Sequence, residues 1–184
     1  MDEYIDIVDK NGQPKGIALK SEAHKNGWYH NTIHLWLYTS DHRILLQQRS
    51  HKKKIYPLLW DVSVAGHIDA GETFETAAIR ETEEEIGLKL SPKSLKKIDT
   101  RLHESSYADG TILDYEFHQV YISELNVDLN ALTPQVDEVE ALKLVSFTEF
   151  EDLLQNSETN SHFIASNRTN YTFVLDAIKT QCRL

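Results

Sequence analysis

The segment spanning residues 66–88 constrains the fold most, because it combines a tight loop with a helix whose two ends are both marked. Gly66 and Gly71 bracket the loop, and residues 73–86 follow as the helix. The helix opens with the polar pair Thr73 and Thr76, and Gly87 ends it, since glycine adopts the left-handed conformation that closes many helices. Its apolar side is predicted to comprise Phe74, Ala77, Ala78 and Ile79. The pattern therefore predicts a strand–loop–helix unit with one acidic face.

Strands surround this helix on both sides in the sequence. Runs rich in β-branched and aromatic residues, bounded by turn residues, predict strands at 4–8, 16–20, 32–38, 43–49, 60–65, 97–103, 112–122 and 139–147. Ser21 is expected to cap a short helical stretch through His24 that stops at Gly27. Further helices are predicted at 148–154 and 171–180. This order predicts an α/β fold with a mixed β-sheet, helices on both of its faces and an N-terminal β-hairpin extension.

Length and charge exclude several classes of protein. The 184 residues fit one domain, divided into an N-terminal hairpin extension (1–27), a main domain (28–165) and a C-terminal helix (166–184) packed on it. The net charge of −10 argues against binding to nucleic acid or an anionic membrane. No apolar run is long enough to span a bilayer. The single cysteine, Cys182, and the acidic N-terminus without an apolar leader predict a cytoplasmic protein.

The carboxylates of the predicted helix form the clearest candidate site. Glu81 and Glu85 lie four residues apart and share a helix face, and Glu84 adjoins it. Carboxylates at this separation repel one another. A hard divalent cation with oxygen ligands would offset that repulsion. Arg80 is placed to bond a carboxylate from outside the cluster, with Glu72 as its candidate partner. By composition alone, this run of glutamates is typical of a solvated helix face. Only the spacing of the residues can distinguish a metal site from such a face.

The spacing is similar to the signature of the Nudix hydrolases. That signature, the Nudix box, is a glycine, five residues, a glutamate, seven residues, then Arg-Glu-hydrophobic-any-Glu-Glu-any-Gly-hydrophobic; the helix within it is called the box helix. Eight positions match in register: Gly66, Glu72, Arg80, Glu81, Glu84, Glu85, Gly87 and Leu88. Thr82 departs from the pattern, since it stands where an apolar residue is usual, and it is expected to pack the helix without binding metal.

The resemblance implies a fold and an activity. It implies an α/β/α sandwich, and a hydrolase that directs water onto a phosphorus of a nucleoside-diphosphate-linked or other organic diphosphate. It implies Mg²⁺, with Mn²⁺ as the alternative, held by Glu81, Glu84, Glu85 and the carbonyl of Gly66. In this reading the three glutamates are also the catalytic residues, and Glu72 pairs with Arg80. The general base stays open among the helix glutamates and Glu116, Glu138 and Glu140.

A second resemblance concerns the sequence that flanks the box. His24, His30 and His67 lie at positions similar to the metal-binding histidines of the isopentenyl-diphosphate isomerases. Those enzymes carry an essential cysteine immediately before the Gly-His pair, where this chain has Ala65. Without the thiol, protonation at carbon loses its acid–base partner, so isomerisation is disfavoured.

Several alternatives remain open on the sequence. The basic segment is expected to bind substrate phosphates through Arg49 and Lys53, with His67 either assisting them or binding metal. The competing functions are an isomerase and a non-catalytic module that binds a nucleotide. The substrate and the number of metal ions are not determined. The N-terminal hairpin is a candidate homodimer contact, which a monomeric mass in light scattering would contradict.

Overall fold

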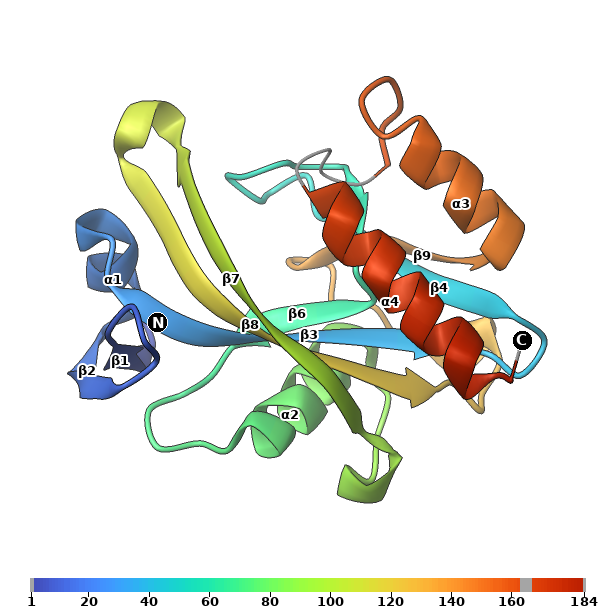
Figure 1. The fold of residues 1–184 in the computed structure, drawn as a ribbon, viewed down its shortest axis with the longest axis horizontal. Coiled ribbons are helices and arrows are strands. Elements are labelled where there is room, and N and C mark those ends of the chain that lie inside the picture. Colours follow the sequence, from blue (N-terminus) through green and yellow to red (C-terminus); the bar gives the residue numbers. More distant parts are fainter. Residues whose placement is uncertain (1, 163–166, 184) are drawn as a thin grey trace.

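Strand β3 (Tyr29–Tyr38) organises the molecule, because it pairs with four other strands of one nine-stranded sheet. The computed structural model describes residues 2–162 and 167–183. Strand β3 lies antiparallel to β1, β4 and β6 and parallel to β8. The sheet is therefore mixed, as predicted, and β3 runs through its middle (Figure 1).

The other elements follow in sequence order. The strands are β1 (Tyr4–Val8), β2 (Pro14–Leu19), β4 (Arg43–Arg49), β5 (Trp60–Asp61), β6 (Val64–His67), β7 (Lys96–Tyr107), β8 (Ile112–Glu124) and β9 (Val139–Ser146). The helices are α1 (Lys20–Asn26), α2 (Phe74–Ile86), α3 (Phe147–Gln155) and α4 (Arg168–Gln181). Short 3₁₀ turns occupy Pro92–Ser94, Ala108–Gly110 and Leu129–Ala131.

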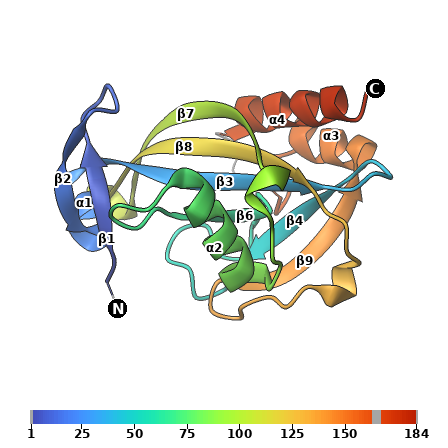
Figure 2. The same ribbon diagram turned by 90° about the horizontal axis from the view of Figure 1, so that it is seen from below.

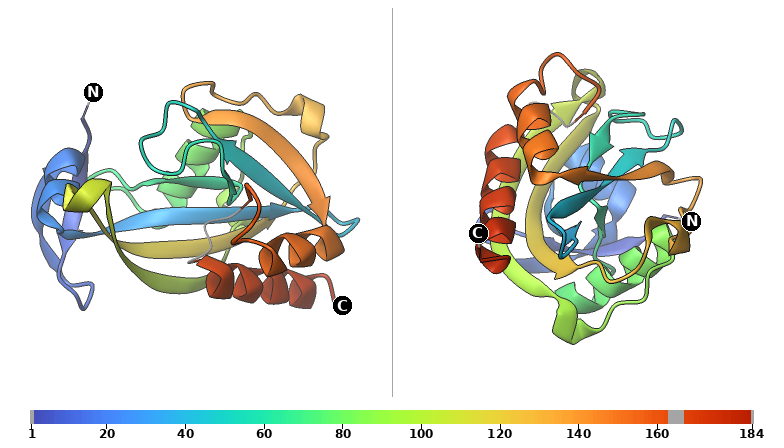
Figure 3. Two further views of the ribbon diagram at one scale, coloured as in Figure 1. Left: turned by 90° about the horizontal axis from the view of Figure 1, so that it is seen from above. Right: turned by 90° about the vertical axis from the view of Figure 1, so that its right-hand side faces the viewer.

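Two apolar clusters pack on opposite faces of the sheet, because successive side chains of a strand point to opposite sides. Ile33, Leu35 and Leu37 of β3 pack with α2 through Ala77, Ala78 and Ile86. Trp36 and Tyr38 pack instead with α3 and α4. Helix α2 consequently covers one face and helices α3 and α4 cover the other (Figures 2 and 3). This is the predicted sandwich.

The predicted strand at 60–65 is wrong in one respect, since it is two strands that pair with different partners. Strand β5 pairs with β4, whereas β6 pairs with β3. Between them the Ser63 hydroxyl accepts the Leu37 N–H at 2.8 Å and donates to the Leu45 carbonyl at 2.6 Å. The serine side chain thus replaces backbone hydrogen bonds where the chain changes neighbours.

The predicted cap at Ser21 is also wrong. Helix α1 begins at Lys20 with Leu19 as its N-cap, and the Ser21 hydroxyl bonds the Asp2 carboxylate at 2.5 Å. The predicted helix end at Gly27 is confirmed, with a φ of 64°. Strands β7 and β8 and helix α4 are longer than predicted. These elements are longer because strand pairing and helix packing include polar residues at their ends, which local sequence patterns assign to loops.

The box helix lies close to its predicted bounds. Thr73 is its N-cap, where Oγ1 accepts the Thr76 N–H at 3.2 Å, and Gly87 closes it with a φ of 70°. Thr82 is fully buried, and its hydroxyl donates to the Ala78 carbonyl at 2.5 Å. A hydroxyl bonded inside its own helix packs without an unpaired polar group, which explains how a threonine fills this apolar position.

The N-terminal hairpin continues the main sheet, because β1 pairs with the start of β3. Its role as a dimer contact and the division of the chain at residue 27 stay predictions. The second predicted boundary, at 165/166, lies outside the described residues. Within the described part of the chain, no helix is long and apolar enough to cross a membrane.

Candidate active site

One large cavity collects most of the predicted site residues. It has a volume of about 710 Å³ and is lined by residues from the N-terminal segment, α1, the box helix, the loop after β4 and strands β3 to β8. Every residue predicted to bind metal or substrate lines it. These are Arg49, Lys53, Gly66, His67, Glu81, Glu84 and Glu85. Arg80 lines it as well, whereas its partner Glu72 is not among the lining residues.

The three box carboxylates differ in their surroundings. Glu85 is buried, and its Oε2 accepts a hydrogen bond from the Gln47 amide at 2.8 Å. Glu81 is mostly buried, whereas the Glu84 side chain is 59% exposed. A Cβ at Gly66 would lie 2.1 Å from Cδ of Glu81, so that carboxylate rests directly against the Gly66 backbone. Helical spacing thus brings all three to one end of the cavity.

Burial leaves the negative charge at this end poorly compensated. It raises the pKa of Glu85 to about 7, against the hydrogen bond from Gln47 and with a contribution from Glu81. Burial also raises the pKa of Glu81, although Arg80 opposes the shift. Buried carboxylates that share a cavity fit a hard divalent cation with oxygen ligands. The residues present therefore match the ion that the motif implies.

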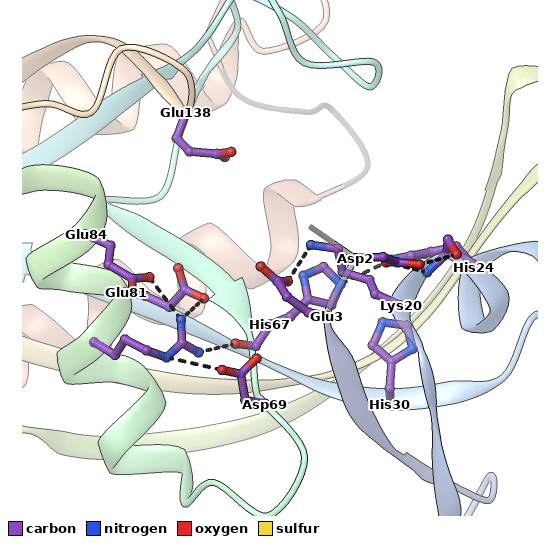
Figure 4. A network of polar contacts seen from close by, with 12 residues as sticks. Asp2, Glu3, Lys20, His24, His30, His67, Asp69, Glu81, Glu84 and Glu138 are labelled. Carbon is purple, nitrogen blue, oxygen red and sulfur yellow. Dashed lines mark hydrogen bonds and ion pairs between the residues drawn. The ribbon is translucent and has the colours of Figure 1, made fainter.

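Arg80 ties the loop to the helix. Its guanidinium donates to Glu72 through Nε at 3.1 Å and Nη2 at 2.9 Å, and Nη2 also donates to the His67 carbonyl at 2.9 Å. Nη1 donates to Glu81 at 2.9 Å and to Glu84 at 3.1 Å. Figure 4 shows Glu81 and Glu84 directed toward this contact. The planar guanidinium fixes several acceptors at once, which a lysine would not do.

Three cations also line the cavity: Arg49 at the end of β4, Lys53 on the loop after it, and Lys20 at the start of α1. Lys53 pairs with Glu138, and burial together with the nearby Arg49 lowers its pKa. Arg49 donates to the Ile55 carbonyl at 3.1 and 2.9 Å, which fixes the loop. Lys20 also lines the cavity and pairs with Glu3 at 2.7 Å. The sequence indicated Arg49 and Lys53 but not Lys20.

A histidine cluster adjoins the cavity, which three of its four members line: His24, His67 and Glu116. His24 comes from α1, His30 from β3 and His67 from β6, and the three surround Glu116 of β8. One ligand atom from each of the four residues lies within 4.8 Å of the others. Nε2 of His24 is 3.1 Å from Nε2 of His67. Figure 4 shows His24, His30 and His67 near Lys20, on the side of the site away from Glu84.

The hydrogen bond made by the His30 ring indicates what this cluster can bind. Its Nδ1 donates to the Trp28 carbonyl at 2.9 Å, so a neutral ring presents a lone pair at Nε2. That buried atom has no hydrogen-bond partner among the described residues and lies 3.4 Å from the Glu116 carboxylate. Two facing lone pairs repel, whereas a cation between them would be bound by both. Imidazole and carboxylate ligands fit a transition-type divalent ion.

Asp114 supports the same centre from the next position on that face of β8. Its Oδ1 is 3.3 Å from Nδ1 of His24. Burial and the nearby Glu116 raise the pKa of Asp114 to about 9. Sequence reasoning missed this residue, although the two-residue spacing from Glu116 on a strand was a usable signal.

The three candidates for a general base outside the box helix have different surroundings. Glu116 is buried and is bonded by His118 at 3.0 Å and by Thr32 at 3.1 Å. Glu138 lines the cavity beside Lys53. Glu140 does not line it and instead pairs with the exposed His51 at 2.7 Å. Of the three, Glu138 faces the cavity without being enclosed by the histidines.

Comparisons with known proteins agree with this arrangement. A family model described as NUDIX domain matches residues 28–166. The chain is 34% identical over 187 residues to Nudix hydrolase 3 of Arabidopsis thaliana, covering 100% of this chain and 24% of that protein. It is also 30% identical to isopentenyl-diphosphate Delta-isomerase 2 of Photorhabdus laumondii, covering 85% of each chain.

A solved structure extends the likeness to the fold. The crystal structure of DR0079 from Deinococcus radiodurans superposes with a TM-score of 0.63 at 21% identity, covering 86% of this chain and 90% of that one. The chain spans about a quarter of the length of the Arabidopsis relative. The likeness to that relative is therefore a likeness to one part of a longer protein.

Proposed function

Because the chain belongs to the Nudix hydrolase family, we propose that it hydrolyses a diphosphate bond in a small organic diphosphate, with Mg²⁺ as its cofactor and Mn²⁺ as the alternative. One observation carries the proposal. Glu81, Glu84 and Glu85 face the same cavity as the cations Arg49 and Lys53. Such a cavity offers a metal site and phosphate-binding groups side by side.

The roles follow from the contacts. Glu81, Glu84, Glu85 and the Gly66 carbonyl would hold the metal. Arg80, itself anchored by Glu72, would keep Glu81 and Glu84 in place by donating to both. When bound, Mg²⁺ neutralises charge on the phosphate and lowers the pKa of the attacking water. The family membership and the buried acidic site together support these assignments.

The substrate side of the proposal rests on Arg49 and Lys53, which would contact the phosphate oxygens. Glu138 is the best-placed group from the later loop to accept a proton, because it faces the cavity and its partner Lys53 would turn to the phosphate. His67 was a candidate for substrate binding. Its Nε2 faces His24 and Glu116, which favours a metal contact instead.

We propose that the histidine cluster holds a second divalent ion of transition type. Hydrogen bonds of the kind that orient metal-binding imidazoles are already in place, from His30 to the Trp28 carbonyl. The variant His30→Ala should lose most of the zinc or manganese that the wild-type chain retains after dialysis. His51→Ala is the matched control, since His51 is exposed outside the cavity. Metal content is measured by mass spectrometry, and equal content in all three proteins would contradict the assignment.

A substrate panel separates the competing functions. The protein is incubated with nucleoside-diphosphate-linked compounds, simple alkyl diphosphates and isopentenyl diphosphate, with and without Mg²⁺. Mg²⁺-dependent release of phosphate or a nucleotide is expected. Formation of the double-bond isomer would favour the isomerase, which the similarity to the Photorhabdus enzyme keeps as the second candidate. Binding without turnover of any compound would favour the non-catalytic module.

A further inference from the structure

The part of the cavity between the sheet and the start of α4 is polar. Five side chains from separate elements line it, and together they are called the polar bay: His34, Asp61, His103, His118 and Asn167. His34 lies two residues before Trp36 on β3, and therefore on the sheet face that α4 covers. The polar bay contains none of the box-helix glutamates, so it is separate from the proposed metal site.

The three imidazoles of the polar bay form a stack. The His118 ring lies 3.9 Å from the His34 ring and 5.1 Å from the His103 ring, with interplanar angles of 21° and 24°. Nε2 of His118 is engaged by Glu116 at 3.0 Å, and Nε2 of His103 lies 3.3 Å from the Tyr107 hydroxyl. Stacking fixes the ring positions, and each neutral imidazole offers one donor and one acceptor. The stack is thus a rigid wall with polar edges.

The acidic and amide groups opposite are buried. Asp61 is 7% exposed and Asn167 is 8% exposed. Oδ1 of Asp61 accepts the Tyr171 hydroxyl and the Val62 N–H at 2.8 Å. Among the described residues both of these hydrogen bonds to the carboxylate end on Oδ1, which leaves acceptor capacity on Oδ2. The amide nitrogen of Asn167 donates to the Tyr171 hydroxyl at 3.4 Å, and within residues 2–162 and 167–183 no hydrogen bond ends on its Oδ1.

A hydrocarbon group would leave these buried polar atoms without partners. A site built to hydrogen-bond a hydroxyl rejects the analogue that lacks it, because each unpaired buried group weakens binding by about tenfold or more. We infer that the polar bay receives a hydroxyl-bearing group attached to the diphosphate, such as a polyol or a sugar. This inference rests on the proposed hydrolase and names the class of its substrate.

Two diphosphates of equal chain length test the inference. Glycerol diphosphate and propyl diphosphate differ only in two hydroxyl groups. We expect a kcat/KM for glycerol diphosphate at least about tenfold above that for propyl diphosphate with the wild-type protein and Mg²⁺. His103→Phe keeps a ring beside His118 but removes both polar atoms, and it should reduce the ratio to about threefold or less. The ratio does not depend on the fraction of protein that folds.

Controls separate this inference from the hydrolase proposal. His51→Phe, outside the cavity, should keep the wild-type ratio, and Asp61→Asn provides a second change within the polar bay. A preference for propyl diphosphate, or a ratio that neither polar-bay variant alters, would overturn the inference while leaving the hydrolase intact. Calorimetry covers the remaining case. Tighter binding of glycerol diphosphate without cleavage would support the polar bay and reject the hydrolase, and binding of neither compound would reject both.

Discussion

Replacing Glu85 with glutamine is expected to abolish Mg²⁺-dependent hydrolysis and, at pH 8, to stabilise the metal-free protein. Glutamine keeps the size of the side chain and an oxygen for the hydrogen bond from Gln47. It removes the charge that a divalent cation needs. Loss of a direct ligand should exceed the roughly 10–100-fold cost of losing an outer partner of a metal site, so kcat/KM should fall by more than about a hundredfold.

The stability effect follows from the pKa of Glu85. Burial raises that pKa to about 7, above its ordinary value of 4.5. Between these values the folded state binds a proton that the unfolded state does not, so stability falls as pH rises through this window. Above pH 7 the full penalty, on the order of 3 kcal/mol, is present, and glutamine avoids it. At pH 5 the carboxyl is protonated in the folded state and the two proteins should differ little.

Thermal unfolding in EDTA at pH 5 and pH 8, together with phosphate release, checks both parts. For a chain of this size the gain at pH 8 corresponds to a Tm higher by roughly 6–12 °C. Glu83→Gln is the matched control, because Glu83 lies exposed on the same helix and pairs with Lys89 at 3.1 Å. Full activity in Glu85→Gln, or an equal loss in the control, would contradict the assignment.

Replacing Gly66 with alanine is expected to remove activity while the fold survives. The added methyl would lie 2.1 Å from Cδ and 2.3 Å from Oε1 of Glu81, distances that no packed atoms tolerate. The atoms in the way belong to the end of a flexible side chain, so the carboxylate would swing aside and the backbone would stay. The displaced Glu81 could then no longer share a cation with Glu85, and kcat/KM should fall by about a hundredfold or more.

Gly71→Ala is the control for this substitution. Nothing lies within 4 Å of a Cβ at Gly71, but its φ of 79° strains any residue with a side chain. This variant should lose about 1 kcal/mol of stability and keep its activity. Mg²⁺ titrations followed by calorimetry, with melting curves for both variants, distinguish the two cases. Wild-type Mg²⁺ affinity in Gly66→Ala would show that Glu81 does not bind the ion.

The box helix was predictable because its determinants are local. A threonine cap, a glycine stop and carboxylates at helical spacing all lie within a short stretch of chain, and the structure places them within one residue of the predicted bounds. The pairing of Arg80 with Glu72 follows from the same short loop. The change of partner between β5 and β6 was not predictable, because it depends on Ser63 meeting Leu37 and Leu45 from two other strands.

The sequence by itself determined the family and the acidic face of α2, because each depends on residue spacing within one segment. The order of strand and helix patterns along the chain determined the mixed α/β fold. Only the tertiary structure gathered His24, His30, His67 and Glu116 into one cluster, since they come from one helix and three strands. It alone set Asp61 and Asn167 beside the histidine stack. The parallel pairing of β3 with β8 decides the cluster, because it brings His30 opposite Glu116 across 86 residues of sequence. Such a register is fixed by hydrogen bonds between strands and by packing on both faces of the sheet, which no local pattern records.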